Sequence, residues 1–175
     1  MEANNIKPAN ESPVSEPQAV TQFDAPKTIA IVGEIPFSGA EVARELYHAG
    51  FNVRVLCPDS AELAALSGRK ESAANSLVTV KGDLENESAI RETLLGAFAV
   101  VFLSPIALNG RVYRAKSHLD DCKRVIAAAE AGAARKFVYH SALGAYPKAL
   151  SRTMREAAQA ETLFQNGRCE DYCIR

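Results

Sequence analysis

Several signals that assign a compartment or a partner are missing from this sequence. Its four cysteines include no C-x-x-C pair, which favours reduced thiols in a cytoplasmic protein over a disulfide framework. No run approaches the roughly 18 apolar residues that a membrane-spanning helix needs. The N-terminus lacks the basic, apolar and small-residue order of a signal peptide and the arginine-rich character of a transit peptide. We therefore expect a cytoplasmic protein that does not associate with membranes.

A strong charge of either sign is missing as well. Twenty basic and 21 acidic residues give a formal charge of −1 at pH 7, which offers no electrostatic attraction to nucleic acid. The three histidines are dispersed, so no metal site is expected. The segment SHLDDCKR (117–124) contains His118, Asp120 and Asp121. These three do not share a helix face in the number that a metal needs, and we interpret the segment as a solvated helix surface.

The length of 175 residues suits one domain and a tail. Residues 1–27 contain several prolines and little apolar surface, and such a stretch cannot offset the entropy of its own ordering. We expect a flexible N-terminal tail there, with a partner-binding arm as the alternative. The domain is expected to span residues 28–175, where short apolar runs alternate with longer helical patterns.

Six apolar runs in this domain predict strands, at 28–33, 52–57, 76–83, 98–104, 136–142 and 171–175. Helices are expected between them: one closed by Gly50, a short one opened by Asp59 or Ser60, one over 85–97, one over 111–132 that ends at Gly132, and one over 151–165. Parallel neighbours need long crossover connections. The alternation therefore predicts an α/β fold, a Rossmann-type doubly wound parallel sheet of about six strands in the order 3-2-1-4-5-6.

The turn after the first strand, VGEIPFSG (32–39), has the layout of a dinucleotide-binding motif. In that motif the first glycine makes the tight turn, the second lets the backbone approach the pyrophosphate, and the third allows the helix to pack closely on the strand. Gly33 and Gly39 suit the first and third roles. Pro36 occupies the second position, where its ring narrows the gap and its missing N–H removes one phosphate donor.

The remaining residues of this turn leave two outcomes open. Glu34, if it points inward, repels a pyrophosphate by about 1 to 4 kcal/mol. Phe37 and Ser38 keep N–H groups that can donate to it. Pro36 near the first helical position also suits a simple helix start. Dinucleotide binding is therefore either retained in weakened form or lost.

Several segments of the domain together carry a family resemblance: VGEIPFSG, VRVL, VKGDLENESAIRETLLGAFAVVFLS, ARKFVYHSALGA, AAQAE and DYCIR. With them the chain resembles the atypical short-chain dehydrogenase/reductases over residues 28–175. It is close to the NmrA-like proteins and to the NAD(P)-binding proteins similar to complex I assembly factors or subunits. The resemblance implies a bound NAD or NADP.

The resemblance also implies where the cofactor lies. Asp83 and Leu84 would flank the adenine, and Leu103 and Ser104 would lie beside the nicotinamide ribose. For Asp83 the alternative is a helix or turn cap, and for Ser104 it is an ordinary strand-ending turn.

The end of the second strand bears on the type of cofactor. Family members that use NADP often carry an arginine where this chain has Pro58. Asp59 can accept a hydrogen bond from the ribose hydroxyl of NAD, but it also serves as a helix cap. The sequence therefore favours NAD over NADP only slightly.

The catalytic pair of the family, Tyr-x-x-x-Lys, has no counterpart here. Aligning AAQAE with the family's segment puts Thr153 at the tyrosine and Ala157 at the lysine, and neither side chain can transfer the proton. The serine that often accompanies the pair aligns with Ser141 or Ala142, and Ser141 is interpreted as a strand-end residue. No catalytic residue and no metal ligand are expected.

Three functions remain open from the sequence. The first is an NAD(P)-binding protein without Tyr/Lys catalysis that acts in cofactor sensing, regulation or assembly, with a dinucleotide and a protein as candidate partners. The second is an NAD(P)-dependent reductase or sugar-nucleotide epimerase whose remaining site residues lie beyond this chain. The third is a cofactor-free structural subunit. We expect the chain to be either naturally minimal or a fragment.

Overall fold

The computed structural model describes residues 26–33, 35–58, 75–104 and 115–175. Six parallel strands form one sheet, with bounds β1 (Thr28–Gly33), β2 (Asn52–Cys57), β3 (Leu77–Lys81), β4 (Ala99–Leu103), β5 (Lys136–His140) and β6 (Glu170–Ile174). Their order across the sheet is β3-β2-β1-β4-β5-β6. This is the doubly wound Rossmann order that the sequence predicts, so the fold-class prediction is confirmed.

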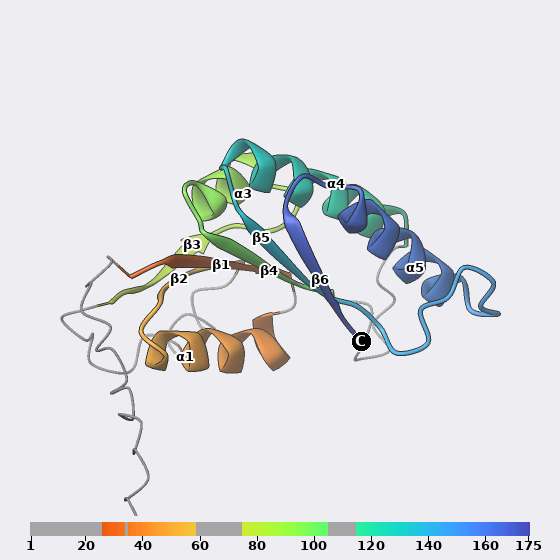
Figure 1. Ribbon diagram of the computed structural model, residues 1–175, viewed down its shortest axis with the longest axis horizontal. Helices are drawn as coiled ribbons and strands as arrows, with labels where there is room; N and C mark the ends of the chain where they lie inside the picture. The colour runs from red at the N-terminus through yellow and green to blue at the C-terminus, as the bar shows by residue number, and fades with distance from the viewer. Residues whose placement is uncertain (1–25, 34, 59–74, 105–114) are drawn as a thin grey trace, which may run out of the picture.

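Helices cover both faces of this sheet. A π-helical turn, η1 (Ile35–Gly39), leads into α1 (Ala40–His48), and further helices are α3 (Glu87–Leu94), α4 (Ala115–Ala131) and α5 (Arg152–Gln165). Figure 1 shows α1 on one face of the sheet and α3, α4 and α5 together on the other. A parallel sheet is stable only when both faces are covered in this way, because its central strands are apolar on both sides.

The core is divided accordingly into two clusters. Towards α3, α4 and α5, buried aromatic and aliphatic side chains pack together, among them Phe102, Phe137, Tyr139 and Phe164. Towards α1, the cluster consists of smaller aliphatic side chains such as Ile31, Val53 and Val55. The two clusters fix the register of the strands, since a one-residue slip would turn each strand's buried residues to the wrong face.

The predicted strands agree with the observed ones, most closely in the first two, which run over 28–33 and 52–57 as expected. The third and fifth end two residues earlier than predicted, at Lys81 and His140. The predicted tail falls on residues that are not described, apart from Pro26 and Lys27. The Pro26 carbonyl accepts a hydrogen bond from Asn52 Nδ2 at 2.9 Å, so the described chain is tied to the sheet from its first residue.

Helix α4 ends as predicted near Gly132, but for a different reason. The residue with a left-handed backbone is Ala133, with φ 58°. A side chain at position 132 would bring a Cβ within 2.8 Å of the Leu94 carbonyl oxygen. Glycine is therefore required at 132 because helix α3 packs closely there. The short helix predicted from Asp59 or Ser60 lies outside the described residues.

The four cysteines all lie in the described part of the chain and form no disulfide. Cys57 and Cys122 are buried, Cys169 is half-buried and Cys173 is exposed on β6. Among the described helices, none has both the length and the apolar character that crossing a membrane requires.

Candidate functional site

The centre of the candidate site is the place where the strand order reverses. From β1 the chain proceeds outward through β2 to β3, and then returns to β4 on the other side of β1. In sheets of this kind ligands bind at the carboxyl ends of the strands, where the loops from neighbouring strands diverge. Gly33 at the end of β1 and Leu103 at the end of β4 are register partners at this point.

Gly33 lets the two central strands approach each other closely. Its φ is +107°, a conformation that favours glycine, and a Cβ at this position would overlap the Leu103 carbonyl oxygen. The first role of the motif, the tight turn, therefore falls to Gly33 as predicted. No other residue would allow the chain to leave β1 in this direction without separating β1 from β4.

The five residues after this turn are helical rather than extended. Ile35–Gly39 form the π-helical turn η1, so Pro36 lies in the first turn of a helical segment, where proline is tolerated. The first N–H groups of a helix have no partner within the helix and attract anions. Phe37 and Ser38 contribute such groups, whereas Pro36 contributes none. Gly39 has φ −64° and ψ −39°, an ordinary helical conformation, and directly precedes α1.

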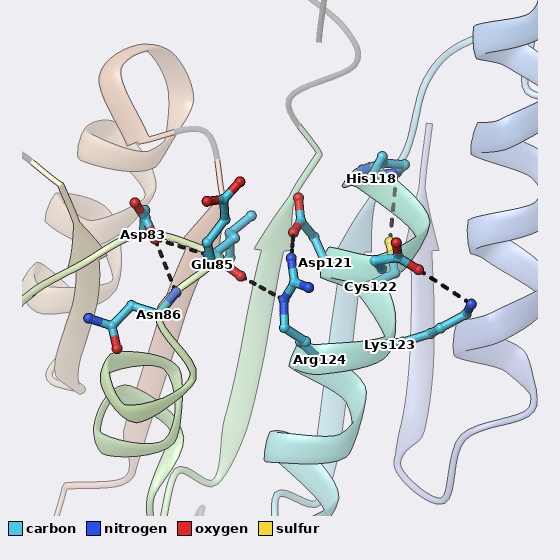
Figure 2. A network of polar contacts seen from close by, with 10 residues as sticks. Asp83, Glu85, Asn86, His118, Asp121, Cys122, Lys123 and Arg124 are labelled. Atoms are coloured by element: carbon cyan, nitrogen blue, oxygen red, sulfur yellow. Dashed lines mark hydrogen bonds and ion pairs between the residues drawn. The ribbon is translucent and has the colours of Figure 1, made fainter. Parts of the chain in front are cut away.

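On the other side of β2, the turn between β3 and α3 is held by its own polar groups (Figure 2). Asp83 Oδ1 accepts hydrogen bonds from the backbone N–H groups of Glu85 at 2.9 Å and Asn86 at 3.1 Å. Asn86 Oδ1 in turn accepts from the Ala89 N–H at 3.1 Å and caps α3. The turn-cap alternative for Asp83 is therefore confirmed. Its side chain is nevertheless exposed, and no described residue donates to its second oxygen, Oδ2.

Gly82 lets this turn approach α3. A Cβ at position 82 would lie 2.5 Å from the Ala89 Cβ. The Gly82 N–H also donates to the Cys57 carbonyl at 3.1 Å, which ties the turn to the end of β2.

A contact from α4 completes the turn. Arg124 Nε donates to the Leu84 carbonyl oxygen at 2.8 Å, and Arg124 Nη2 pairs with Asp121 (Figure 2). Asp121 is almost completely buried, with 3% of its side chain exposed. The sequence does not indicate this link, because it joins residues 40 positions apart and its acceptor is a backbone atom.

The predicted residues at the end of β4 are buried. Leu103 is 4% exposed and Ser104 3% exposed, and the Ser104 N–H donates to the His140 carbonyl at 3.1 Å. The strand-ending reading of Ser104 agrees with this bond. Of the other predicted site residues, Asp59 lies outside the described residues, as does Glu34.

A buried hydroxyl lies at the end of β5. Ser141 is 2% exposed, and its Oγ forms no hydrogen bond of good geometry with a described residue. It lies close to Glu161 on α5, which also forms a two-pronged ion pair with Arg175 at 2.9 and 2.6 Å. Burial opposes ionisation of Glu161, but the bonds from Arg175 and the nearby Ser141 hydroxyl outweigh it and hold the Glu161 pKa below its ordinary value.

The positions aligned with the family's catalytic pair lie at the start of α5. Thr153 is exposed, whereas Ala157 is completely buried. Ala157 packs in a cluster of small side chains with Ala142, Ala145 and Ala158. There is thus no titratable side chain at either position, and the space around residue 157 is filled by alanine methyl groups.

The interpretation of residues 117–124 as a solvated surface is wrong for two of its three polar residues. Asp120 is exposed, but Asp121 is buried and His118 is 0% exposed. These side chains lie on the face of α4 that packs on the sheet, because the apolar stripe of the helix includes Cys122 and Val125 next to them. The described residues contain no group of three or more His, Cys, Asp or Glu side chains that could hold a metal ion.

His118 belongs to a buried polar contact inside this core. Its Nε2 lies 3.1 Å from the Tyr139 hydroxyl and 3.7 Å from Cys122 Sγ, and its ring stacks near Phe102. Burial lowers the pKa of His118 to about 4 and raises the pKa values of Tyr139 and Cys122. All three groups are therefore neutral at pH 7. Tyr139 is fixed in the core, with 1% of the residue exposed.

The residues present fit a dinucleotide at three points: the glycine turn at Gly33, the helical N–H groups that begin at η1, and the exposed carboxylate of Asp83. They do not include the second glycine of the motif. The fold and these features define a Rossmann domain of the dinucleotide-binding type.

Comparison with models of known families assigns the chain to one family. The model of the NAD(P)H-binding family matches residues 37–174, and the chain belongs to this family. A comparison with curated proteins found no match.

Solved structures share the fold at low sequence identity. NADPH-dependent quinone oxidoreductase QOR2 from Escherichia coli, complexed with NADPH, is 19% identical, with a TM-score of 0.66 over 84% of this chain and 48% of its own. NmrA, a negative transcriptional regulator in complex with NAD, is 16% identical, with a TM-score of 0.66 over 86% of this chain and 45% of its own. Triphenylmethane reductase from Citrobacter sp., complexed with NADP(H), is 12% identical, with a TM-score of 0.66 over 85% of this chain and 48% of its own.

The chain thus shares its fold with NmrA and with these reductases, in agreement with the sequence resemblance. The chain spans about half the length of these solved structures.

Proposed function

We propose that this chain binds NADH or NADPH at the carboxyl edge of its sheet and acts in cofactor sensing, regulation or assembly, without a Tyr/Lys catalytic pair. In this proposal the helical N–H groups of Phe37, Ser38 and Gly39 hold the pyrophosphate. Gly33 lets the cofactor lie against the end of β1. The nicotinamide ring of such a cofactor supplies hydride chemistry when a protein also provides a proton donor.

The adenine end lies beside Asp83 and Leu84 in this proposal, and the nicotinamide ribose lies beside Leu103 and Ser104. Asp83 is exposed, and its Oδ2 can accept a hydrogen bond from the adenine amino group. Asp59 is assigned to the ribose hydroxyl from the sequence alone. A protein partner for the regulatory role and the absence of nucleic-acid binding both remain predictions.

One observation carries the choice of a non-catalytic role. The position aligned with the catalytic lysine is Ala157, completely buried among Ala142, Ala145 and Ala158. A lysine could not take this place without displacing the cluster, since the neighbouring methyl groups fill the volume. The likeness to NmrA, a negative transcriptional regulator in complex with NAD, agrees with this choice by analogy only.

A reductase or sugar-nucleotide epimerase is the second candidate. It is favoured by the chain's coverage of about half of structures such as QOR2 and the triphenylmethane reductase. In that case residues outside this chain would supply the proton donor and the substrate site.

Titration of the full chain with NADPH and NADH, followed by fluorescence, tests the proposal. We expect saturable binding and no oxidation of NADPH when quinone or carbonyl substrates are added. Asp83→Asn keeps the oxygen that caps the turn but removes the charge, so it should weaken binding by about tenfold. Glu85→Gln, at an exposed neighbouring position in the same turn, should leave affinity unchanged.

Three other outcomes would contradict the proposed function. NADPH oxidation by the chain alone would favour the reductase. No binding of either dinucleotide at millimolar concentration would favour the third function, a cofactor-free structural subunit. Equal effects of Asp83→Asn and Glu85→Gln would show that adenine does not contact Asp83.

A further inference from the structure

We infer that Arg124 on helix α4 is the positioning residue of the adenine subsite: it holds the Leu84 carbonyl and thereby sets the Asp83–Leu84 turn against the cofactor. This inference rests on the proposed function, because it needs adenine to lie beside that turn. Arg124 itself does not touch the ligand and acts only through the backbone of Leu84.

The bonds within the turn leave the Leu84 carbonyl oxygen to be held from outside. Asp83 Oδ1 fixes the N–H groups of Glu85 and Asn86, and Asn86 fixes the start of α3. The Glu85 N–H belongs to the same peptide unit as the Leu84 carbonyl, so Asp83 holds that unit on its N–H side. The Asn86 N–H also donates to the Asp83 carbonyl at 3.2 Å. On its carbonyl side the unit is held by Arg124 Nε, at 2.8 Å from the oxygen. The orientation of the residue expected to flank adenine thus depends on Asp83 and on a side chain of another helix.

Arg124 can do this because its own position is fixed. Its Nη2 pairs with Asp121, one turn earlier on α4, and 3% of the Asp121 side chain is exposed. The guanidinium is planar and presents several in-plane donors in a rigid fork. Nη2 can therefore bind Asp121 while Nε binds the Leu84 carbonyl. A charged donor also makes a stronger bond to a carbonyl than a neutral one. The buried carboxylate therefore orients the arginine, and the arginine orients the turn.

The same helix carries a matched pair that does not reach the turn. Lys123 pairs with Asp120 at 3.5 Å with the same i, i+3 spacing, but the two side chains are 63% and 60% exposed. Figure 2 shows Lys123 pointing away from the turn and Arg124 pointing towards it. Substitution at 123 therefore removes an ion pair from α4 without touching Leu84.

The test compares Arg124→Met with Lys123→Met in the full chain, using ADP as the probe for the adenine half and nicotinamide mononucleotide for the other half. We expect Arg124→Met to weaken ADP binding by about tenfold, the usual effect of losing a hydrogen bond from a charged group. Binding of nicotinamide mononucleotide should not change. Arg124→Lys should restore part of the ADP affinity, and Lys123→Met should behave as the wild type with both probes.

A second measurement needs no ligand. Hydrogen exchange of the Glu85 and Asn86 amides reports on the Asp83 turn, because both donate to Asp83. These amides should exchange several-fold faster in Arg124→Met than in Lys123→Met if Arg124 holds the turn.

The two measurements separate failure of this inference from failure of the proposed function. If the wild type binds dinucleotides and Arg124→Met leaves ADP affinity unchanged, or lowers the affinity for both probes equally, Arg124 has no positioning role. Unchanged exchange in Arg124→Met overturns the inference even if no ligand binds. If the wild type binds no dinucleotide, the proposed function fails and the adenine role of Arg124 fails with it, while faster exchange would still show that Arg124 holds the turn.

Discussion

At the scale of single residues, the centre of the candidate site depends on Gly33, which has no side chain. Gly33 combines a positive φ with a position where a Cβ would overlap the Leu103 carbonyl oxygen. Gly50 has a positive φ as well, at +90°, but nothing lies within 4 Å of its missing Cβ. Substitutions at the two glycines can therefore distinguish the free-energy cost of a left-handed backbone from the cost of a steric overlap with β4.

Substituting alanine at each position measures these costs. Gly50→Ala should lower the free energy of unfolding by about 1 to 2 kcal/mol, the strain of a left-handed alanine. Gly33→Ala should lower it by about 3 to 5 kcal/mol, because overpacking against β4 adds to that strain. Chemical denaturation of both variants is the measurement. Equal losses at the two positions would contradict the close contact between the ends of β1 and β4.

The role of a residue could be predicted from the sequence where that role depends on the identity of its side chain. Gly33 in its turn, and Ala157 at the position that aligns with the family's lysine, could both be identified from the motif and the spacing. The role of Arg124 could not be predicted, because its partner is the Leu84 carbonyl. Every residue has a backbone carbonyl, so the identity of residue 84 does not indicate the bond. His118 and Asp121 were misjudged since polar side chains are usually exposed, and only the packing of α4 shows that both are buried.

At the scale of elements, helix α4 carries a buried polar group against the sheet. His118 is neutral at pH 7, with a pKa lowered by burial to about 4, and it contacts Tyr139 on β5 at 3.1 Å. In the unfolded chain the same ring titrates at about 6.5. The unfolded state therefore binds more protons than the folded state between these two values, so stability falls as the pH decreases from 6.5 towards 4.

Between pH 6.5 and 4 the free energy of unfolding should fall by about 3 kcal/mol, because the His118 pKa is lower in the folded state by roughly 2.5 units. Urea denaturation at pH values from 7 to 4.5 measures it. Glu161, whose pKa lies below its ordinary value, contributes mainly below this range. His118→Gln removes the titration and should flatten the dependence on pH, whatever its effect on stability at pH 7. An equally steep dependence in this variant would show that His118 is not the responsible group.

Element order could be predicted because periodicity and turn residues are local properties. The six strands and the order 3-2-1-4-5-6 followed from short apolar runs that alternate with helical patterns. Strand ends could not be predicted to the residue: β3 and β5 end at Lys81 and His140, although backbone bonds from Gly82 to Cys57 and from Ser141 to Ile174 continue one residue further. The π-helical form of residues 35–39 was also not foreseen, since the motif describes glycine positions and not helix type.

At the scale of the whole molecule, the described chain forms a six-stranded Rossmann sheet, and we propose that it works without a Tyr/Lys pair. Membership of the NAD(P)H-binding family rests on residues 37–174. The likeness to both reductases and a regulator at 12 to 19% identity establishes the fold and no particular activity. The central claim is therefore a retained nucleotide site beside an absent proton donor.

A crystal structure of the protein with NADPH tests this claim most directly. We predict adenine beside Asp83 and Leu84, the pyrophosphate at the N–H groups of residues 37–39, and no tyrosine or lysine within hydrogen-bond distance of the nicotinamide ribose. A cofactor bound away from the carboxyl edge of the sheet, or a tyrosine and a lysine converging on the nicotinamide, would contradict it.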